Sequence, residues 1–422
     1  VRNQGNLIAE RGSLTVNKGK LVVLDGSTVT ATSDITVLDD NIEIRNDAPK
    51  EGPHPILTVT ADNTIRTHYD MIVAGDNIQV NATNIYVFDN ASNPNQGTLF
   101  IHGDNVTVSA QSDTNNAEAR AWKLAMHGVG NGQANFIIGN GGLRVDNETF
   151  IAAASQIKST GSITFNGTTN MTNGTVFSQK DINITSAAPD TGLTMTGGIL
   201  NATGTLKIAT AQAEVTGGDL KADVLDLNQH TSISKSTLTV GQTTKISANG
   251  KDADSVTLTD ITGDLGFVNI SGSGEKAVDN IVNISQTSYT DTGQTLMMNG
   301  MDISNASVNV KASITGHTTP WWEFGTHGDR LATTTLHNNG YLTLDSGVIW
   351  QDNIDLQDNS TLTLGGATIT GNLSAEGTST SGNYSINLDV TDGGTVKGDV
   401  NLKGLNITGN TSNKVQVLGF VD

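Results

Sequence analysis

The sequence is poor in several residue types, and each shortage excludes something. There is no cysteine among its 422 residues, which excludes disulfide bonds and cysteine-ligated metal ions. Apolar runs are only a handful of residues long, far short of the roughly 20 that a membrane-spanning helix needs. Positive charge is also scarce, because 42 acidic residues against 23 basic ones give a net charge of −19. Nucleic acid is therefore not expected as a partner, since phosphate binding requires clustered lysine and arginine.

What remains is turn and strand chemistry. Aromatic residues make up only 4% of the chain and charged residues 15%, compared with about 25% charged residues in typical soluble proteins. Glycine occurs 47 times, and threonine, asparagine and serine are abundant. This composition is typical of short strands closed by tight turns. The lack of cysteine fits an exported chain that crosses an outer membrane unfolded, and it fits equally a long β-stack that needs no disulfides.

A strand-turn unit recurs along the whole chain. Each copy has a turn carboxylate or amide, then a strand whose apolar and polar residues alternate with period 2. The copies begin at Asp40-Asn41-Ile42, Asp76-Asn77-Ile78, Asp104-Asn105-Val106, Asp181-Ile182, Asp352-Asn353-Ile354 and Asp399-Val400. Such units bury their apolar faces only by stacking on one another. The sequence therefore predicts an all-β fold, a three-stranded parallel β-helix with coils of roughly 20–24 residues.

The spacing of the repeat is irregular, so we expect several insertions to leave the stack. The candidates are 45–55, 89–97, 111–133 and 315–332. Within the third, Glu118 to Met126 is the only run with good helix propensity, and we expect one or two helical turns there. No linker divides the chain, which predicts a single continuous domain over 1–422.

Taken together, the short β repeats, the acidic charge, the missing cysteines and the Gly/Asn/Thr-rich turns resemble the passenger domains of bacterial autotransporter adhesins of the AIDA-I and antigen 43 type. The resemblance covers about 5–410. It implies a right-handed β-helix of pectin-lyase-like shape, export through the periplasm and an outer-membrane β-barrel that this chain does not contain, and display on the bacterial cell surface. Members of that family aggregate cells, build biofilm, or bind matrix proteins and glycans of the host.

The turn aspartates are the first candidate binding residues. If their turns fall at one corner of successive coils, they form a row that can accept hydrogen bonds from sugar hydroxyls or bind Ca²⁺. The row would contain Asp40, Asp76, Asp104, Asp181, Asp219, Asp264, Asp302, Asp352 and Asp399. The alternative is ordinary turn chemistry, in which each side chain caps backbone groups. The Gly-Gly-x-Gly-x-Asp repeat of calcium-binding β-rolls is absent, so we expect no metal and no cofactor.

Three further groups are candidates. Trp321 and Trp322, with Arg330 nearby, interrupt the repeat in a segment suited to stacking on a sugar or anchoring a protein. Their alternative role is to seal a loop onto the stack. Lys180-Asp181 and Lys251-Asp252 pair a cation with an acid at turns, where they can meet the charged groups of a glycosaminoglycan or remain solvated surface charge.

These features favour an adhesin over an enzyme. The prediction is a surface protein that holds a host extracellular-matrix glycan or protein along its side, with self-association and biofilm formation as the alternative. A carbohydrate-active β-helix enzyme is the second alternative. Its paired carboxylates, such as Asp223 with Asp226, are uninformative in so acidic a chain, and the Arg-x-Pro-x-x-Arg stretch shared by lyases is absent.

Overall fold

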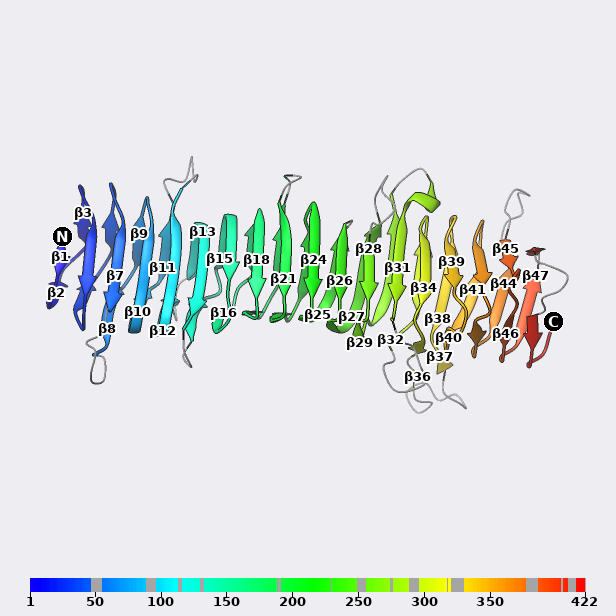
Figure 1. The fold of residues 1–422 in the computed structure, drawn as a ribbon. Helices are drawn as coiled ribbons and strands as arrows, with labels where there is room; N and C mark the ends of the chain where they lie inside the picture. The colour runs from blue at the N-terminus through cyan, green and yellow to red at the C-terminus, as the bar shows by residue number, and fades with distance from the viewer. Residues whose placement is uncertain are drawn as a thin grey trace. The chain divides into compact units, whose positions relative to one another are not determined.

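A computed structural model describes the chain except for residues 47–54, 89–95, 113–115, 130–132, 187, 189–190, 229, 249–255, 274–275, 288–295, 317, 320–329, 377–385, 404, 409–414 and 422. The chain forms two compact units, Val1–Ala211 (unit 1) and Gln212–Asp422 (unit 2). Each unit is a stack of short parallel strands (Figure 1).

The strands of unit 1 form three ladders, which are named by the order in which the chain enters them. The first contains β1 (Arg2–Asn3), β4 (Leu21–Leu24), β7 (Ile42–Asn46), β18 (Thr168–Thr172) and β21 (Gly192–Thr196). The second contains β2 (Asn6–Ala9), β5 (Thr28–Ala31), β8 (Leu57–Ala61), β14 (Ala134–Ile138), β16 (Ser155–Ser159), β19 (Thr175–Ser178) and β22 (Ile199–Ala202). The third contains β3 (Leu14–Val16), β6 (Ile35–Val37), β9 (Thr64–Thr67), β11 (Asn84–Val87), β17 (Ile163–Asn166), β20 (Ile182–Thr185) and β23 (Thr205–Ala209).

Four long strands of unit 1 turn a corner without a break. β10 (Met71–Ala82) and β12 (Thr98–Ala110) run from the first ladder into the second, whereas β13 (Glu118–Gly128) and β15 (Gly142–Ile151) run from the third into the first. At the bend of β13 and β15 the register shifts between Ala121 and Lys123, so that Trp122 lies opposite both Asp146 and Asn147. This bend is the corner at which the candidate site described below is found.

Unit 2 repeats the same plan. Its first ladder contains β24 (Gln212–Thr216), β26 (Thr231–Ser234), β28 (Val256–Thr259), β31 (Ile281–Ser285), β34 (Ser307–Lys311), β39 (Tyr341–Leu344), β42 (Thr361–Leu364), β45 (Ile386–Asp389) and β48 (Leu405–Thr408). The second contains β29 (Thr262–Asp264), β32 (Leu296–Met298), β35 (Ile314–Gly316), β40 (Ile349–Trp350), β43 (Thr368–Ile369), β46 (Gly394–Val396) and β49 (Val415–Val417).

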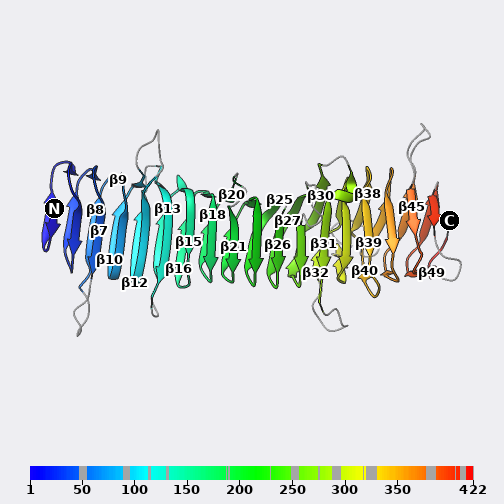
Figure 2. The ribbon, with the colours of Figure 1, turned by 45° about the horizontal axis from the view of Figure 1, so that its top comes forward.

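The third ladder of unit 2 contains β30 (Phe267–Gly272), β33 (Met301–Ser304), β38 (Thr333–His337), β41 (Asn353–Leu356), β44 (Leu373–Glu376) and β47 (Val400–Lys403). β25 (Asp219–Asn228) and β27 (Thr237–Ala248) run from the second ladder into the third. A short hairpin of β36 (Thr318–Thr319) and β37 (Arg330–Leu331) is antiparallel and stands outside the ladders. Figure 2 shows both stacks from a second angle.

Three strand segments make one coil: from β16 to β20, for example, each strand pairs with the strand three places further along the chain. In unit 1, Ile163 pairs with Ile182 and Ile182 with Leu206, which gives coils of 19 and 24 residues by subtraction. The predicted all-β, three-stranded parallel β-helix is therefore confirmed in each unit. Among the described residues, the one helical element is a single 3₁₀ turn, Ala277–Asp279, and no helix has the length and apolarity to cross a membrane.

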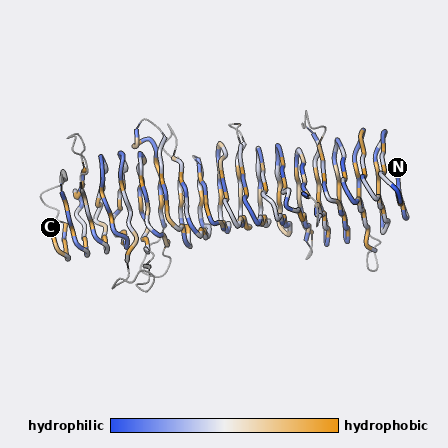
Figure 3. Tube along the Cα trace, turned by 180° about the vertical axis from the view of Figure 1, so that it is seen from behind, coloured by the Kyte–Doolittle hydropathy of each residue, from blue (hydrophilic) through white to orange (hydrophobic). Residues whose placement is uncertain are grey.

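Stacking explains why these sequences form strands. Inward positions of successive coils place apolar side chains directly on one another, as with Phe165 and Ile184, both fully buried. Full burial of such a side chain contributes about 2 kcal/mol of transfer free energy. Figure 3 shows hydrophobic and hydrophilic residues alternating along the strands. The core of each unit is thus a set of apolar columns, and the outward positions are left for polar residues.

The corner between the first and second ladders explains the asparagine and glycine of the repeat. One residue there adopts left-handed backbone angles, which asparagine and glycine tolerate best. In unit 1 this residue is Asn77 (φ 53°), Asn105 (φ 55°), Ala154 (φ 54°), Asn173 (φ 52°) or Gly197 (φ 66°). In unit 2 it is Gly217 (φ 69°), Lys235 (φ 49°) or Asp260 (φ 51°). The turn signal in the sequence is therefore a backbone requirement.

The predicted helix at Glu118 to Met126 is wrong, and so is the expectation that this part of 111–133 leaves the stack. These residues belong to strand β13, in which Ala119, Ala121, Leu124 and Met126 are buried. Helix propensity differs by only tenths of a kcal/mol per residue, so alignment with the neighbouring coils outweighs it. Most of the predicted excursions at 45–55, 89–97 and 315–332 lies outside the described residues, although the β36–β37 hairpin shows that the last one does leave the ladders.

Candidate ligand-binding groove in unit 1

The nine turn aspartates do not form one row. In unit 1, Asp40 precedes a first-ladder strand, Asp76 and Asp104 are register partners within β10 and β12, and Asp181 precedes a third-ladder strand. In unit 2, three of them precede or begin strands (Asp219, Asp352, Asp399), Asp264 ends β29, and Asp302 lies within β33. Asp352 is fully buried. The condition for a row is not met, because coil lengths vary and similar turns therefore fall at different corners.

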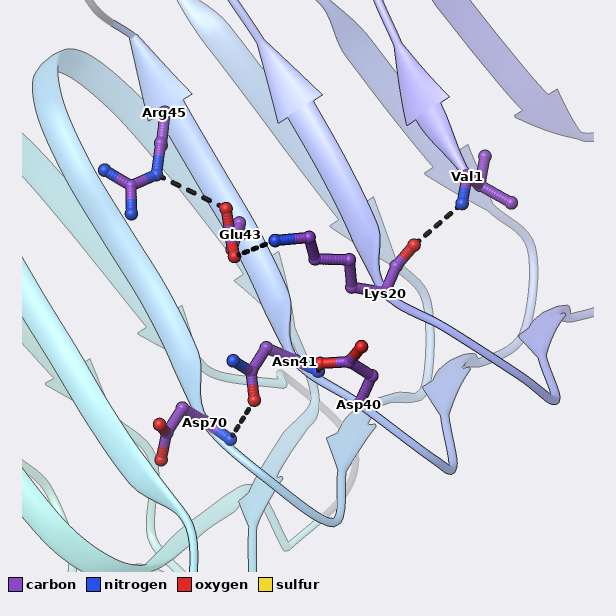
Figure 4. Close-up of polar contacts among 7 residues, drawn as sticks. All are labelled: Val1, Lys20, Asp40, Asn41, Glu43, Arg45 and Asp70. Carbon is purple, nitrogen blue, oxygen red and sulfur yellow. Dashed lines mark hydrogen bonds and ion pairs between the residues drawn. The ribbon is translucent and has the colours of Figure 1, made fainter.

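Turn acids and amides, Asp181 among them, bind the backbone of the next coil instead. Asp181 accepts a hydrogen bond from the backbone N–H of Thr205 at 2.8 Å. Asn41 accepts one from the N–H of Asp70 at 3.0 Å (Figure 4). Asp70 accepts one from the N–H of Thr98 at 2.7 Å. The acceptor stands just before the first inward apolar residue of its strand. The repeated turn acid or amide is thus a structural tie between coils, in line with the turn-chemistry alternative.

The other predicted binding residues do not come together in the described part of the chain. Four of them lie outside the described residues, namely Lys251, Asp252, Trp321 and Trp322. Of Arg330 only the backbone, paired with Thr319, is described. Lys180 is exposed at a corner of unit 1, and the carboxylate of Asp302 in unit 2 lies 2.8 Å from Nε2 of His337.

The first group that sequence reasoning missed lies on the outward face of the third ladder of unit 1. The hydroxyl of Tyr86 donates to Oε1 of Glu118 at 2.6 Å, and the guanidinium of Arg66 lies 5.0 Å from the centre of the Tyr86 ring. Burial, then the hydrogen bond to Glu118 and its charge, raises the pKa of Tyr86 to about 12. The phenol therefore stays protonated and works as a fixed hydrogen-bond donor.

A second group continues the same face. Nε of Arg120 lies 2.7 Å from Asp146, and Arg144 forms a further ion pair with the same carboxylate. Burial raises the pKa of Asp146, but hydrogen bonds from Arg144 and Arg120 outweigh it and bring the pKa below its usual value. The side chain of Asp146 is 7% exposed, whereas that of Arg144 is 58% exposed. One guanidinium therefore remains accessible while its carboxylate partner is enclosed.

A groove of about 600 Å³ lies beside this pair, at the corner between the third and first ladders. It is lined by Arg144, Asp146, Asn147, Asn166, Gly167, Thr185, Ser186, Ala188, Thr191 and Ala209. Nδ2 of Asn166 donates to Asp146 at 3.3 Å, and the hydroxyl of Thr185 donates to Oδ1 of Asn166 at 2.8 Å. A hydrogen-bonded column, Asp146–Asn166–Thr185, thus runs along the groove from coil to coil.

One corner residue that lines this groove must be glycine, because two coils approach each other closely there. A Cβ on Gly167 would lie 2.0 Å from the carbonyl oxygen of Asn147, and the residue has a φ of +82°. Trp122 lies at the same corner in the preceding coil, opposite Asp146 and Asn147, and its side chain is half-buried. The arrangement offers a cation, an amide, hydroxyls and a nearby indole, which are the groups that bind polar ligands with apolar ring faces.

A second hollow, of about 550 Å³, lies over the first ladder of unit 1 and is lined by Val1, Arg2, Lys20, Val22, Leu24, Glu43 and Arg45. Two of its three cationic side chains share one carboxylate: Lys20 lies 2.8 Å and Arg45 3.5 Å from Glu43 (Figure 4). Within the described residues, no three His, Asp or Glu side chains gather with metal-binding geometry. The groove at Arg144 is therefore the stronger candidate.

Strand alternation contains a signal for this groove. Two charged residues fall on one face of a strand in each of two runs, Arg144-Val145-Asp146 and Glu118-Ala119-Arg120. The second pair was missed because Glu118 to Met126 was interpreted as a helix. The two pairs lie side by side only through the register of neighbouring coils, which is a property of the tertiary structure.

Comparison with models of known protein families, with curated proteins and with solved structures finds no match for this chain.

Proposed function

We propose that this chain is an adhesive protein of the bacterial cell surface, built like an autotransporter passenger, that holds an acidic glycan of the extracellular matrix in the groove at Arg144. The observation that carries the proposal is an accessible guanidinium at the head of a hydrogen-bonding groove that runs across successive coils of unit 1.

The chemistry favours carboxylate or sulfate groups of the glycosaminoglycan class. Arginine binds either group through two parallel N–H···O bonds. Because Asp146 also binds Arg120, Arg144 is one of two cations on a single carboxylate, and this cluster has a net positive charge. Asn166, Thr185 and Ser186 add donors and acceptors suited to sugar hydroxyls. This cluster can attract an acidic glycan although the chain has a net charge of −19. At physiological salt, the acidic residues more than about 8 Å away are largely screened.

Binding fits the groove better than hydrolysis does. Most glycoside hydrolases need two carboxyl groups about 5–9.5 Å apart, one of them able to donate a proton. Among the described residues that line this groove, Asp146 is the one carboxylate, and its lowered pKa makes it a poor acid. The groove therefore supports the adhesin proposal over the enzyme alternative.

The test is binding of the chain to immobilised heparin, hyaluronan, a neutral dextran and fibronectin. We expect the acidic glycans to bind in a salt-sensitive manner, and Arg144→Ala to weaken that binding about tenfold or more. Lys158→Ala is the matched control, because Lys158 is an exposed cation on β16 in the second ladder. Binding to fibronectin alone, or equal losses in the two variants, would contradict the proposal.

Self-association remains the second candidate, supported by one feature of unit 2. Its first ladder carries an outward row of small polar residues in register, Thr257, Asn283, Asn309, Thr343 and Thr363. Nδ2 of Asn309 donates to Oδ1 of Asn283 at 3.0 Å. A flat polar row of this kind can pair with its like through hydrogen bonds. Concentration-dependent association in sedimentation velocity that Asn309→Lys abolishes would favour this candidate.

A further inference from the structure

Two imidazoles meet on the outward face of the first ladder of unit 1, away from the glycan groove residues. Strands β12 and β13 are neighbours in the stack (Figure 1). His102 of β12 and His127 of β13 are register partners. Their Nδ1 atoms lie 3.2 Å apart, and His127 is exposed to solvent. The ring of Phe100 stacks on that of His102, with centroids 5.8 Å apart and planes inclined by 22°. His102 is therefore held in place from one side while its Nδ1 faces its partner.

The rings face each other through their nitrogens. The ring centroids are 5.1 Å apart, so the two Nδ1 atoms are closer than the centroids by 1.9 Å (5.1 minus 3.2). Such a difference requires both Nδ1 atoms to point along the line that joins the rings. With the ring planes inclined by 31°, both side chains must rotate away from this line for the two nitrogen lone pairs to converge on one point beside it.

The separation matches the spacing of two nitrogen ligands on one metal ion. Metal–nitrogen bonds of about 2.0–2.1 Å place neighbouring ligands roughly 2.9 Å apart at a right angle and roughly 3.4 Å apart at the tetrahedral angle. The observed 3.2 Å lies between these values. We propose that His102 and His127 form a two-imidazole site for a late first-row divalent metal ion, Cu²⁺ above all.

The choice of metal follows from the ligands. Neutral imidazole suits Cu²⁺, Ni²⁺ and Zn²⁺, and among divalent first-row ions Cu²⁺ binds a given nitrogen site most tightly. The described residues supply no third His, Asp or Glu within reach. Water therefore completes the coordination, and the open positions can accept a donor atom from an incoming ligand.

The experiment is a titration of the whole chain with Cu²⁺ at neutral pH, followed by calorimetry and electron paramagnetic resonance. We expect one ion to bind with nitrogen splitting from two imidazoles. His102→Ala and His127→Ala should each weaken this binding at least tenfold and remove the two-nitrogen signature. His68→Ala is the matched control, because this half-buried histidine at another corner of unit 1 leaves the pair intact.

Circular dichroism of each variant separates loss of the site from loss of the fold, since both histidines lie on the surface face of β12 and β13. Binding of Cu²⁺ that changes less than twofold in the double variant would overturn the proposal. So would a resonance signal with one coordinated imidazole in the unmodified chain, because the pair would then be a simple hydrogen bond.

Discussion

The side-chain oxygen of Asn372 accepts a hydrogen bond of 2.8 Å from the backbone N–H of Asp399, which lies one coil further along unit 2. Asn372 itself donates its N–H to the side chain of Asn353 at 2.9 Å, and Asp399 accepts from the N–H of Phe420 at 3.0 Å. The three side chains therefore tie four successive coils at one corner.

Removing the middle side chain tests this tie. Asn372→Ala should lower the free energy of unfolding by about 1 kcal/mol, because the N–H of Asp399 loses its partner. Asn372→Asp keeps an acceptor oxygen in place and should retain most of the stability. Urea unfolding of both variants measures the difference. Equal midpoints for Asn372→Ala and the unmodified chain would show that the tie has no energetic role.

Two core hydroxyls of unit 1 should be dispensable. Thr149 and Thr169 are register partners at inward positions, both are almost fully buried, and neither hydroxyl has a hydrogen-bond partner. Replacing threonine by valine keeps the shape and removes the cost of burying an unpaired hydroxyl.

Each of Thr149→Val and Thr169→Val should therefore raise the free energy of unfolding by about 1 kcal/mol, measured as a higher thermal or urea midpoint. The matched control is Thr194→Val, an exposed threonine of β21, which should change stability by less than about 0.5 kcal/mol. Destabilisation by both core substitutions would show that the hydroxyls are satisfied in solution.

The Asp146 ion pairs predict a pH effect. The folded-state pKa of Asp146 lies below its usual value, so its contribution is fully present above the unfolded-state pKa of about 3.9. It is lost as the pH falls through the folded-state pKa. Asp146→Asn should lower stability at neutral pH by about 2 kcal/mol.

The same substitution should flatten the decline in stability on the acid side, since the proton uptake by this carboxyl is removed. Urea midpoints measured between neutral pH and pH about 3 compare the two chains. Asp62→Asn, an exposed carboxyl of unit 1, serves as the control and should leave the profile unchanged. Parallel profiles for the unmodified chain and Asp146→Asn would refute the assignment.

Lys235 occupies a left-handed position that suits it badly. Its φ is 49°, whereas Gly217 holds the preceding corner of the same kind in unit 2 with φ 69°. For a residue with a Cβ, these left-handed backbone angles cost about 1–2 kcal/mol of folding free energy. Glycine avoids this cost, but it also makes the unfolded chain more flexible, which offsets part of the gain in stability.

Lys235→Gly should therefore raise the unfolding free energy by up to about 1 kcal/mol. Lys221→Gly, at an exposed position inside strand β25, should lower it by about 0.5–1 kcal/mol. Thermal midpoints of the two variants should move in opposite directions. A loss of stability in both would mean that the lysine side chain contributes more than its backbone costs.

The strand pattern could be predicted from the sequence because it is local. Alternation of apolar and polar residues, as in Asp181-Ile182-Asn183-Ile184, requires only that one face of the strand be buried. The turn residues are equally local, since left-handed angles favour Asn and Gly at positions such as Asn173 and Gly197. The helix predicted at Glu118 failed because its strand form depends on the coils on either side of it.

The candidate site could not be predicted in the same way. Arg120 and Asp146 are 26 residues apart, by subtraction. The intervening sequence does not indicate that one coil has this length, so their contact could not be predicted. The same holds for His102 and His127, which the register of β12 and β13 brings together.

The amino-acid sequence alone therefore determined that the chain would stack β-strands, with turn asparagine, aspartate and glycine setting the corners. The tertiary structure decided which outward side chains meet. The physical reason is that alternation selects the face of a strand, whereas the number of residues in each coil selects its neighbour, and that number is settled only when the apolar columns of the core come into register.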